Sequence, residues 1–251
     1  MKKYNLLTYT AFLLMPLVSN AQTAGFDETQ KAEIGQVVHD YIISHPEVIT
    51  EAVQVLQAKE MKAWEEKAKQ AILNNMDGIF NSKSPNSGAK SPKVSVVEFF
   101  DYNCPHCKVM QKTLNDILSD NKDVLVVYKE LPVLNEGSLF AAKAALAARE
   151  QNKYNEFHDK MMTAQEVLTE DKILALAKEI GLDIDKLNKD MASSKVNDEL
   201  TANRKIAMDM GLRGTPAFVF GKYPATKDMK VELLPGEVQK QDLIEKIKSY
   251  K

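Results

Sequence analysis

The sequence predicts a mixed α/β protein, in which an α/β domain carries an inserted block of helices and follows an N-terminal helical segment. Three observations lead to this prediction. Residues 27 to 80 have a helical period almost throughout. A stretch rich in Ser, Pro, Asn and Lys follows. From Val94 onward, strand and helix patterns succeed one another in the order β-α-β, several helices, then β-β-α.

The composition is that of a soluble globular protein. The chain has 251 residues, which suffice for one large domain or for a modest domain with an appendage. Its formal net charge is −2. A slightly acidic balance argues against nucleic acid as a partner.

Residues 1–21 have the features of a signal peptide. Lys2 and Lys3 form a basic start, and the apolar run 6–18 is short for a membrane span. Small residues at Ser19 and Ala21 suit cleavage after Ala21. The alternative is a retained membrane anchor. Removal of both lysines leaves 31 basic and 35 acidic residues, a mature net charge of −4.

Residues 22–81 are expected to form a helical oligomerisation segment. Asp27 and Gln30 form a capping-box pattern, and Ser44-His45-Pro46-Glu47 ends one helix and starts a longer one. The apolar stripe of such helices needs a partner surface. We favour a second copy of the chain, because residues 82–93 have the composition of a linker. The alternative is an N-terminal extension folded onto the body of the protein.

Residues 94–251 are expected to form the second domain, with a helical insertion at about 138–211. The expected strands are 94–100, 124–129, 217–220 and 231–234. The expected helices are 108–119, 139–150, 154–162, 172–180, a short one from Asp183, 196–210 and a final one containing Leu243, Ile244 and Ile247. The sequence shows no internal repeat.

Cys104-Pro105-His106-Cys107, which contains the only two cysteines, is the candidate active site. A Cys-x-x-Cys pair between a strand and a helix is typical of redox chemistry. At the first turn of a helix, the dipole and free N–H groups favour a thiolate. His106 adds a donor and Pro105 starts the helix. Cys104 is therefore assigned as nucleophile, and Cys107, one turn further in, as resolving thiol.

Other uses of the two cysteines fit the sequence less well. A structural disulfide across so short a loop would constrain the unfolded chain little. Zinc needs four ligands, and haem attachment needs a histidine where Lys108 stands. His39, His45 and His158 are interpreted as surface or capping residues. We expect no metal and no cofactor, because the Cys104–Cys107 disulfide is itself the redox group.

Gly214-Thr215-Pro216 is the second informative stretch. A proline directly before the strand at 217–220 is awkward for a central strand. A cis proline that ends a loop, with backbone groups available to an extended peptide, explains its position. The alternative is an ordinary trans proline turn.

These motifs resemble the DsbA family of thioredoxin-fold thiol-disulfide oxidoreductases. The resemblance covers Val94 to Lys251 and implies a thioredoxin-like fold with an inserted helical domain. By position, Cys104 resembles the family's nucleophile, Cys107 its resolving cysteine and Pro216 its cis proline. Glu98 resembles the buried acid under the active site, able to move protons to or from Cys107. The alternative for Glu98 is a paired strand carboxylate.

Two departures from the oxidase pattern concern residues outside the cysteine motif. Thr215 stands where the monomeric oxidase usually carries Val, and it resembles the isomerase branch. The helices at 27–80 resemble the oligomerising segments of a subgroup that includes the suppressor-of-copper-sensitivity proteins. In addition, Asn103 replaces the tryptophan typical of thioredoxin.

The resulting hypothesis is a periplasmic or envelope-associated thiol-disulfide oxidoreductase that forms or isomerises disulfides. Its expected partners are exported cysteine-containing proteins, a membrane redox partner of unknown identity and a second copy of the chain, with a trimer as the alternative. The competing hypothesis is an envelope-associated binding protein, for example for copper, with cysteines as ligands.

Overall fold

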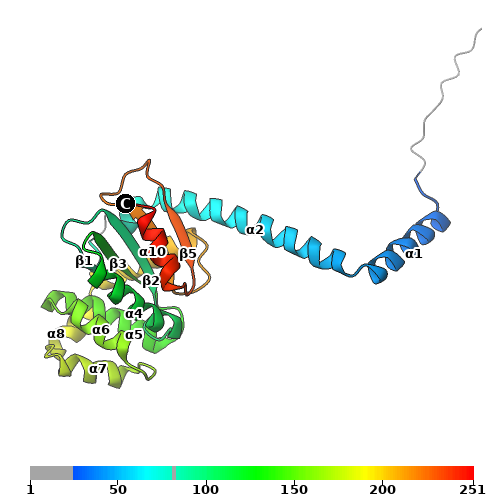
Figure 1. The fold of residues 1–251 in the computed structure, drawn as a ribbon. Helices are drawn as coiled ribbons and strands as arrows, with labels where there is room; N and C mark the ends of the chain where they lie inside the picture. Colours follow the sequence, from blue (N-terminus) through cyan, green and yellow to red (C-terminus); the bar gives the residue numbers. More distant parts are fainter. Residues whose placement is uncertain (1–24, 81–82) are drawn as a thin grey trace, which may run out of the picture. The chain divides into compact units, whose positions relative to one another are not determined.

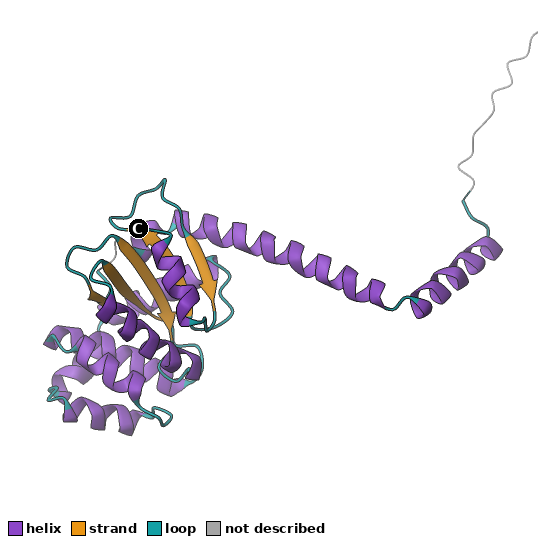
Figure 2. Cartoon of the chain, viewed as in Figure 1, coloured by secondary structure: helices purple, strands orange, loops and turns teal. Residues whose placement is uncertain are grey.

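The computed structural model describes residues 25–80 and 83–251 (Figures 1 and 2). The expected signal peptide at 1–21 lies outside the described residues. The chain divides into two units, of which the first ends at Gln57 and the second comprises Ala58–Lys251.

Helices and strands follow the predicted order closely. The elements are α1 (Glu28–Ser44), α2 (Glu47–Asn74), α3 (Met76–Ile79), β1 (Asn86–Gly88), β2 (Val94–Phe100), α4 (Pro105–Asp120), β3 (Val124–Glu130), α5 (Glu136–Ala148), the 3-10 turn η1 (Arg149–Gln151), α6 (Tyr154–Thr163), α7 (Glu170–Glu179), α8 (Ile184–Met191), α9 (Ser194–Asp209), β4 (Ala217–Lys222), β5 (Glu232–Pro235) and α10 (Lys240–Lys248). No helix within residues 25–80 or 83–251 is long and apolar enough to cross a bilayer.

The described part of the first unit is helical and open to solvent. The predicted capping box of α1 is present: Gln30 N donates to Asp27 Oδ1 at 2.8 Å, and Asp27 N donates to Gln30 Oε1 at 3.1 Å. α1 buries none of its residues. Ile34, Val38 and Tyr41 are between 43% and 54% exposed. An apolar face of this kind needs a covering surface to stabilise the helix.

The second unit is built around a five-stranded sheet in the order β1-β3-β2-β4-β5. β2 and β3 are parallel, and the other pairs are antiparallel. Every residue of β2 is buried, as expected for a central strand covered on both faces. Since side chains alternate along a strand, Val94 and Val96 join one core cluster, and Val97 and Phe99 join the other.

Helices cover both faces of the sheet (Figure 1). The first cluster contains residues of α4, α10 and the helical insertion, including Leu114, Leu243 and Phe157. The second contains residues from the end of α2, from α3 and from α9, including Ile72 and Ile206. The insertion comprises α5 to α9, close to the expected 138–211. Several of its helices begin at side-chain caps, such as those on α5, α7, α8 and α9.

The boundary expected near residue 81 differs from the structure. Ala71, Ile72, Met76 and Ile79 are buried in the second core cluster, so the end of α2 and α3 belong to the second unit. Helical periodicity assigns these residues to the apolar stripe of the N-terminal helices, which was expected to face a second copy of the chain. The same alanine-rich pattern suits both a partner helix and a sheet face, which is why the sequence did not separate the two.

The expected linker at 82–93 contains a strand. β1 pairs antiparallel with β3, with Ser87 opposite Val126. Gly88 has φ +113°, and a Cβ there would lie 2.4 Å from a backbone oxygen of β3. The polar, glycine-containing composition therefore reflects a short edge strand, where one side faces solvent.

Candidate active site

The Cys-x-x-Cys pair lies where β2 passes into α4. Cys104 is the N-cap residue of α4, and Pro105 is at its first position. Both cysteines are free thiols in this structure. Cys104 is 4% exposed and Cys107 is fully buried, as expected for a residue one turn into the helix.

Cys104 sits in surroundings that favour a thiolate. Its pKa falls from 9.0 to about 5, chiefly because the Cys107 thiol donates a hydrogen bond to its sulfur. Partial burial opposes this shift. The backbone N–H groups of His106 and Cys107 lower the pKa further, as the free amides of a helix N-terminus do. The Cys104 thiol lies 3.3 Å from the carbonyl oxygen of Thr215.

The Cys107 thiol has the opposite tendency. Burial raises its pKa, and the neighbouring sulfur of Cys104 and the carboxyl of Glu98 raise it further. At neutral pH the pair therefore consists of one thiolate and one protonated thiol. This asymmetry suits a nucleophile paired with a resolving thiol.

Glu98 is fully buried in β2, opposite Tyr128 of β3 and Phe218 of β4. Neither of its carboxyl oxygens has a hydrogen-bond partner among the described residues. Burial raises its pKa from 4.5 to about 8, and the charge of Cys104 adds to the effect. The structure thus shows no paired strand carboxylate here. Glu98 is a protonated acid at neutral pH, and its ionised form would raise the pKa of Cys107.

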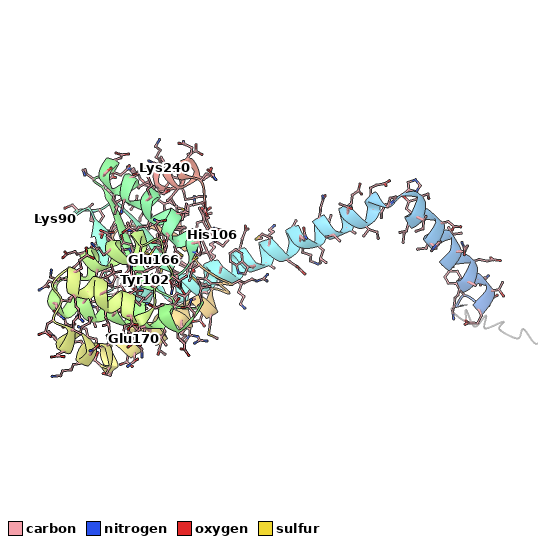
Figure 3. The ribbon with its side chains drawn as sticks, turned by 90° about the horizontal axis from the view of Figure 1, so that it is seen from below. Lys90, Tyr102, His106, Glu166, Glu170 and Lys240 are labelled. Atoms are coloured by element: carbon pink, nitrogen blue, oxygen red, sulfur yellow. The ribbon has the colours of Figure 1, made fainter. Side chains whose placement is uncertain are left out.

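His106 lies at the surface of the second unit (Figure 3). Its Nδ1 is 2.7 Å from Oε2 of Glu237, which follows β5. This contact raises the pKa of His106.

The Thr215–Pro216 peptide bond is cis, as expected from the sequence. The loop places the Thr215 carbonyl against Cys104, and the Pro216 carbonyl accepts a hydrogen bond from Gly236 N at 2.8 Å. The predicted site residues Cys104, Cys107 and Thr215 therefore lie together.

Asn103 is a site residue whose role the sequence analysis missed. Leu168 N donates to its Oδ1 at 2.7 Å, and its Nδ2 donates to Leu168 O at 3.1 Å. Its own N–H donates to the buried Asp101 carboxylate at 2.8 Å, which also accepts from Ser138 Oγ at 2.7 Å. These bonds join the turn before Cys104 to the helical insertion. Asp and Asn are typical turn residues, so the presence of Asp101 and Asn103 just before a helix could have indicated these hydrogen bonds from the sequence.

Lys108 adds further hydrogen bonds between α4 and the insertion. Its Nζ donates to the carbonyl oxygens of Ala164 at 2.6 Å and of Glu166 at 3.1 Å. A cavity of about 660 Å³ lies beside Lys108, lined by residues such as Pro105, Val109 and Val167.

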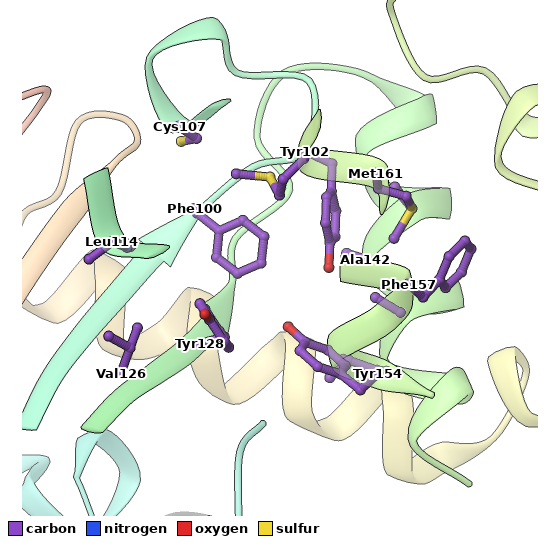
Figure 4. Close-up of a cluster of buried hydrophobic side chains, with 14 of the residues drawn as sticks. Phe100, Tyr102, Cys107, Leu114, Val126, Tyr128, Ala142, Tyr154, Phe157 and Met161 are labelled. Carbon is purple, nitrogen blue, oxygen red and sulfur yellow. The ribbon is translucent and has the colours of Figure 1, made fainter. Parts of the chain in front are cut away.

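A buried polar network lies between β3 and the insertion. Figure 4 shows two of its members, Tyr102 and Tyr154, within the surrounding cluster of buried hydrophobic side chains. The hydroxyls of Tyr102 and Tyr154 donate to Glu130 Oε1 at 3.0 and 2.7 Å. His158 Nδ1 lies 3.1 Å from the Tyr102 hydroxyl. The interpretation of His158 as a surface or capping residue is therefore wrong. Its amphipathic helix packs this face inward, and burial lowers the pKa of His158 to about 3, so the ring is neutral.

No group of three or more His, Cys, Asp or Glu side chains that could hold a metal ion occurs within residues 25–80 and 83–251. Fold and site together define the class of thioredoxin-fold thiol-disulfide oxidoreductases.

Comparison with known proteins refines this class. Residues 95–247 match the DsbA-like thioredoxin domain, and residues 30–63 match the copper resistance protein ScsC N-terminal domain. The chain belongs to the DsbA-like thioredoxin domain family.

Solved structures agree with this assignment. A thioredoxin-like oxidoreductase from Silicibacter pomeroyi is 37% identical, with a TM-score of 0.63 over 70% of this chain and 96% of its own. BcfH from Salmonella enterica Typhimurium is 28% identical, with a TM-score of 0.73 over 88% of this chain and 96% of its own. ScsC from Proteus mirabilis, in a transitional conformation, is 29% identical, with a TM-score of 0.61 over 91% of this chain and 98% of its own.

Curated relatives include longer proteins. The Na(+)/H(+) antiporter NhaA 3 of Salinispora tropica is 28% identical over 153 residues, which are 60% of this chain but 24% of the antiporter. The chain thus spans about a quarter of that relative. A probable disulfide bond formation protein D from Bacillus cereus is 26% identical over 143 residues, covering 52% of this chain and 66% of the relative.

Proposed function

We propose that this chain is an exported thiol-disulfide oxidoreductase that forms and isomerises disulfide bonds in exported proteins. The observation that carries the proposal is the opposed ionisation of the two thiols, with the Cys104 pKa at about 5 and the Cys107 pKa raised. Attack on a disulfide needs a thiolate, and release from a mixed disulfide favours a leaving sulfur of low pKa. Cys104 meets both requirements.

Oxidation of a substrate starts from the Cys104–Cys107 disulfide. A substrate thiolate attacks the Cys104 sulfur, the bond between the two cysteines breaks, and Cys107 leaves with the electron pair. Because an ionised Cys107 is unfavourable in its buried place, its sulfur takes up a proton, which Glu98 can supply from its protonated carboxyl. The substrate's second thiolate then attacks the substrate sulfur. Cys104 leaves as a stable thiolate, and the substrate disulfide is formed.

Isomerisation starts from the dithiol form. The Cys104 thiolate attacks a wrong disulfide of the substrate, and the released substrate thiolate reshuffles the remaining bonds. A later substrate thiolate expels Cys104, so no net electron transfer occurs. The cis Thr215–Pro216 loop, beside the reacting sulfur, is the surface on which we expect the substrate backbone to lie.

The test is refolding of scrambled ribonuclease and oxidation of reduced ribonuclease by wild type, Cys104→Ala and Cys107→Ala. Cys104→Ala should be inactive in both assays. Cys107→Ala should accumulate mixed disulfides with the substrate, because the resolving thiol is gone. Equal rates for wild type and Cys104→Ala would refute catalysis.

We also propose that the first unit joins two copies of the chain, with three copies as the alternative. The exposed apolar side chains of α1 support this assembly, and so does the match of residues 30–63 to an N-terminal domain found in ScsC. Val38→Glu should yield monomers in light scattering, whereas Gln36→Glu, which adds the same charge on the polar side, should not. A Val38→Glu protein that keeps the wild-type mass would contradict the assembly.

The location and partners follow from the same proposal. An exported protein with this chemistry would act in the periplasm or at the envelope, on cysteine-containing exported proteins, with a membrane redox partner and no nucleic acid.

The second candidate is copper binding by the two cysteines, which the name of the match at 30–63 favours. Titration with Cu(I) distinguishes the two: catalysis without tight metal binding supports the exchange reaction.

A further inference from the structure

Glu237 contacts the active-site motif, although neither the motif nor the resemblance points to it. It lies in the turn between β5 and α10, and its Oε2 is 2.7 Å from Nδ1 of His106. The two side chains come from segments 131 residues apart in the sequence. A contact over this separation depends on the tertiary fold.

The turn that carries Glu237 is fixed at the active-site loop. Gly236 has φ +81°, a conformation that favours glycine, and its N–H donates to the Pro216 carbonyl at 2.8 Å. The preceding Thr215 carbonyl is the group that contacts the Cys104 sulfur. The cis-proline loop therefore contacts both the turn that carries Glu237 and the sulfur of Cys104, and Glu237 in turn contacts His106.

The beginning of α10 is also held against α4, the helix that carries His106. Lys240 Nζ lies 2.9 Å from an Asp116 carboxylate oxygen, and Lys112 of α4 lies 3.4 Å from the same oxygen. These two lysines are therefore paired with Asp116, and the carboxylate of Glu237 is the group hydrogen bonded to the imidazole. The other charge that acts on His106 is the thiolate of Cys104.

We propose that Glu237 is a positioning residue that fixes the His106 ring through their 2.7 Å contact and favours its protonated form, and so favours the thiolate form of Cys104, two residues before it. This inference rests on the proposed thiol-disulfide exchange. A cation near the sulfur stabilises the thiolate, and a more stable reduced form makes the disulfide a stronger oxidant. The raised pKa of His106, for which the Glu237 contact is the largest cause, is consistent with this role.

Glu237 can act on Cys104 in two ways that oppose each other. Its negative charge repels the thiolate directly, whereas its bond to His106 favours the positively charged ring, which interacts electrostatically with Cys104. The direct effect does not depend on the state of the imidazole. The effect through His106 operates only above about pH 6.5, because at lower pH the imidazole is protonated without help. The pH profile therefore separates the two routes.

The experiment uses the full chain and Glu237→Gln. NMR titration of the His106 ring in the dithiol form should show that it loses its proton at a lower pH in the variant. Near pH 5.5, where only the direct repulsion differs, the equilibrium constant of the variant with glutathione should equal that of wild type or be slightly more oxidising. Near pH 7.5 it should be about two- to fivefold less oxidising, the range expected for an exposed ion pair. Glu237→Asp should restore part of the difference.

Glu245→Gln, which removes the same charge from an exposed position of α10, is the matched control and should behave as wild type at both pH values. An unchanged His106 titration in Glu237→Gln, or a more oxidising variant at both pH values, would overturn the role of Glu237. If the wild-type cysteines do not exchange with glutathione at all, the proposed function itself fails.

Discussion

Replacement of Glu98 by Gln tests how the buried acid is used. A pKa raised from 4.5 to about 8 means that ionising this carboxyl in the folded protein costs roughly 5 kcal/mol more than in water. The folded state binds the Glu98 proton more tightly than the unfolded state does. Its contribution to stability is therefore complete below about pH 4.5 and is lost as pH rises to about 8.

The assay is denaturant unfolding of reduced wild type and Glu98→Gln between pH 5 and 8.5. Glutamine keeps the shape of the neutral acid and cannot ionise. Relative to the variant, wild type should lose about 1.4 kcal/mol of unfolding free energy per pH unit from pH 5 upward, and this slope should flatten as the pH passes about 8. The lowered pKa of Cys104 has the opposite sign, with stability gained as pH rises above about 5, but both proteins contain it.

A difference between the two proteins that stays constant with pH would refute the reasoning. It would mean that Glu98 titrates at the same pH in the folded and unfolded chains. Glu245→Gln, at an exposed position, should keep the wild-type slope. In the exchange assay, Glu98→Gln should slow the steps in which Cys107 gains or loses its proton, while the Cys104 thiolate remains reactive.

Three further predictions concern the thiolate and the core. Absorbance of the Cys104 thiolate at 240 nm should titrate with a midpoint at about pH 5, and a midpoint near 8.5 would contradict the site geometry. Gly88→Ala should destabilise the protein more than Gly181→Ala in chemical denaturation, because both have positive φ but only at Gly88 would the new methyl group meet a backbone oxygen. Ile72→Ala should lower the free energy of unfolding in chemical denaturation by about 2–5 kcal/mol, because Ile72 is fully buried. Val55→Ala, at an exposed position, should change it by less than about 0.5 kcal/mol. Equal effects would contradict the placement of Ile72 in the core.

The central strands and the cysteine motif could be predicted because their signals are local. β2 was expected at 94–100 and is found there, since a run of apolar and β-branched residues bounded by turn residues is typical of a buried strand. The helical start after Cys104 and the loop before Pro216 are local in the same sense. Each depends on a few adjacent residues and on one preferred backbone conformation.

The features that were missed depend on residues far apart in the chain. β1 has no apolar pattern and exists through its pairing with β3. Glu130 and His158 are buried polar residues, and their shared partner Tyr102 lies 28 and 56 residues away in the sequence. Helical periodicity identifies an apolar face but not the surface that covers it. This is why the end of α2 was assigned to the wrong unit.

The helical insertion does more than enlarge the core, because it holds the turn that presents Cys104. Asn103 clamps both backbone groups of Leu168, and Lys108 holds two carbonyls of the same segment. The cysteine turn is thus fixed on one side by the insertion and contacted on the other by the Thr215 carbonyl. A thiolate that depends on backbone N–H groups needs those groups to point steadily at the sulfur. The four-residue motif supplies the chemistry, and the insertion keeps it in the geometry that lowers the pKa of Cys104.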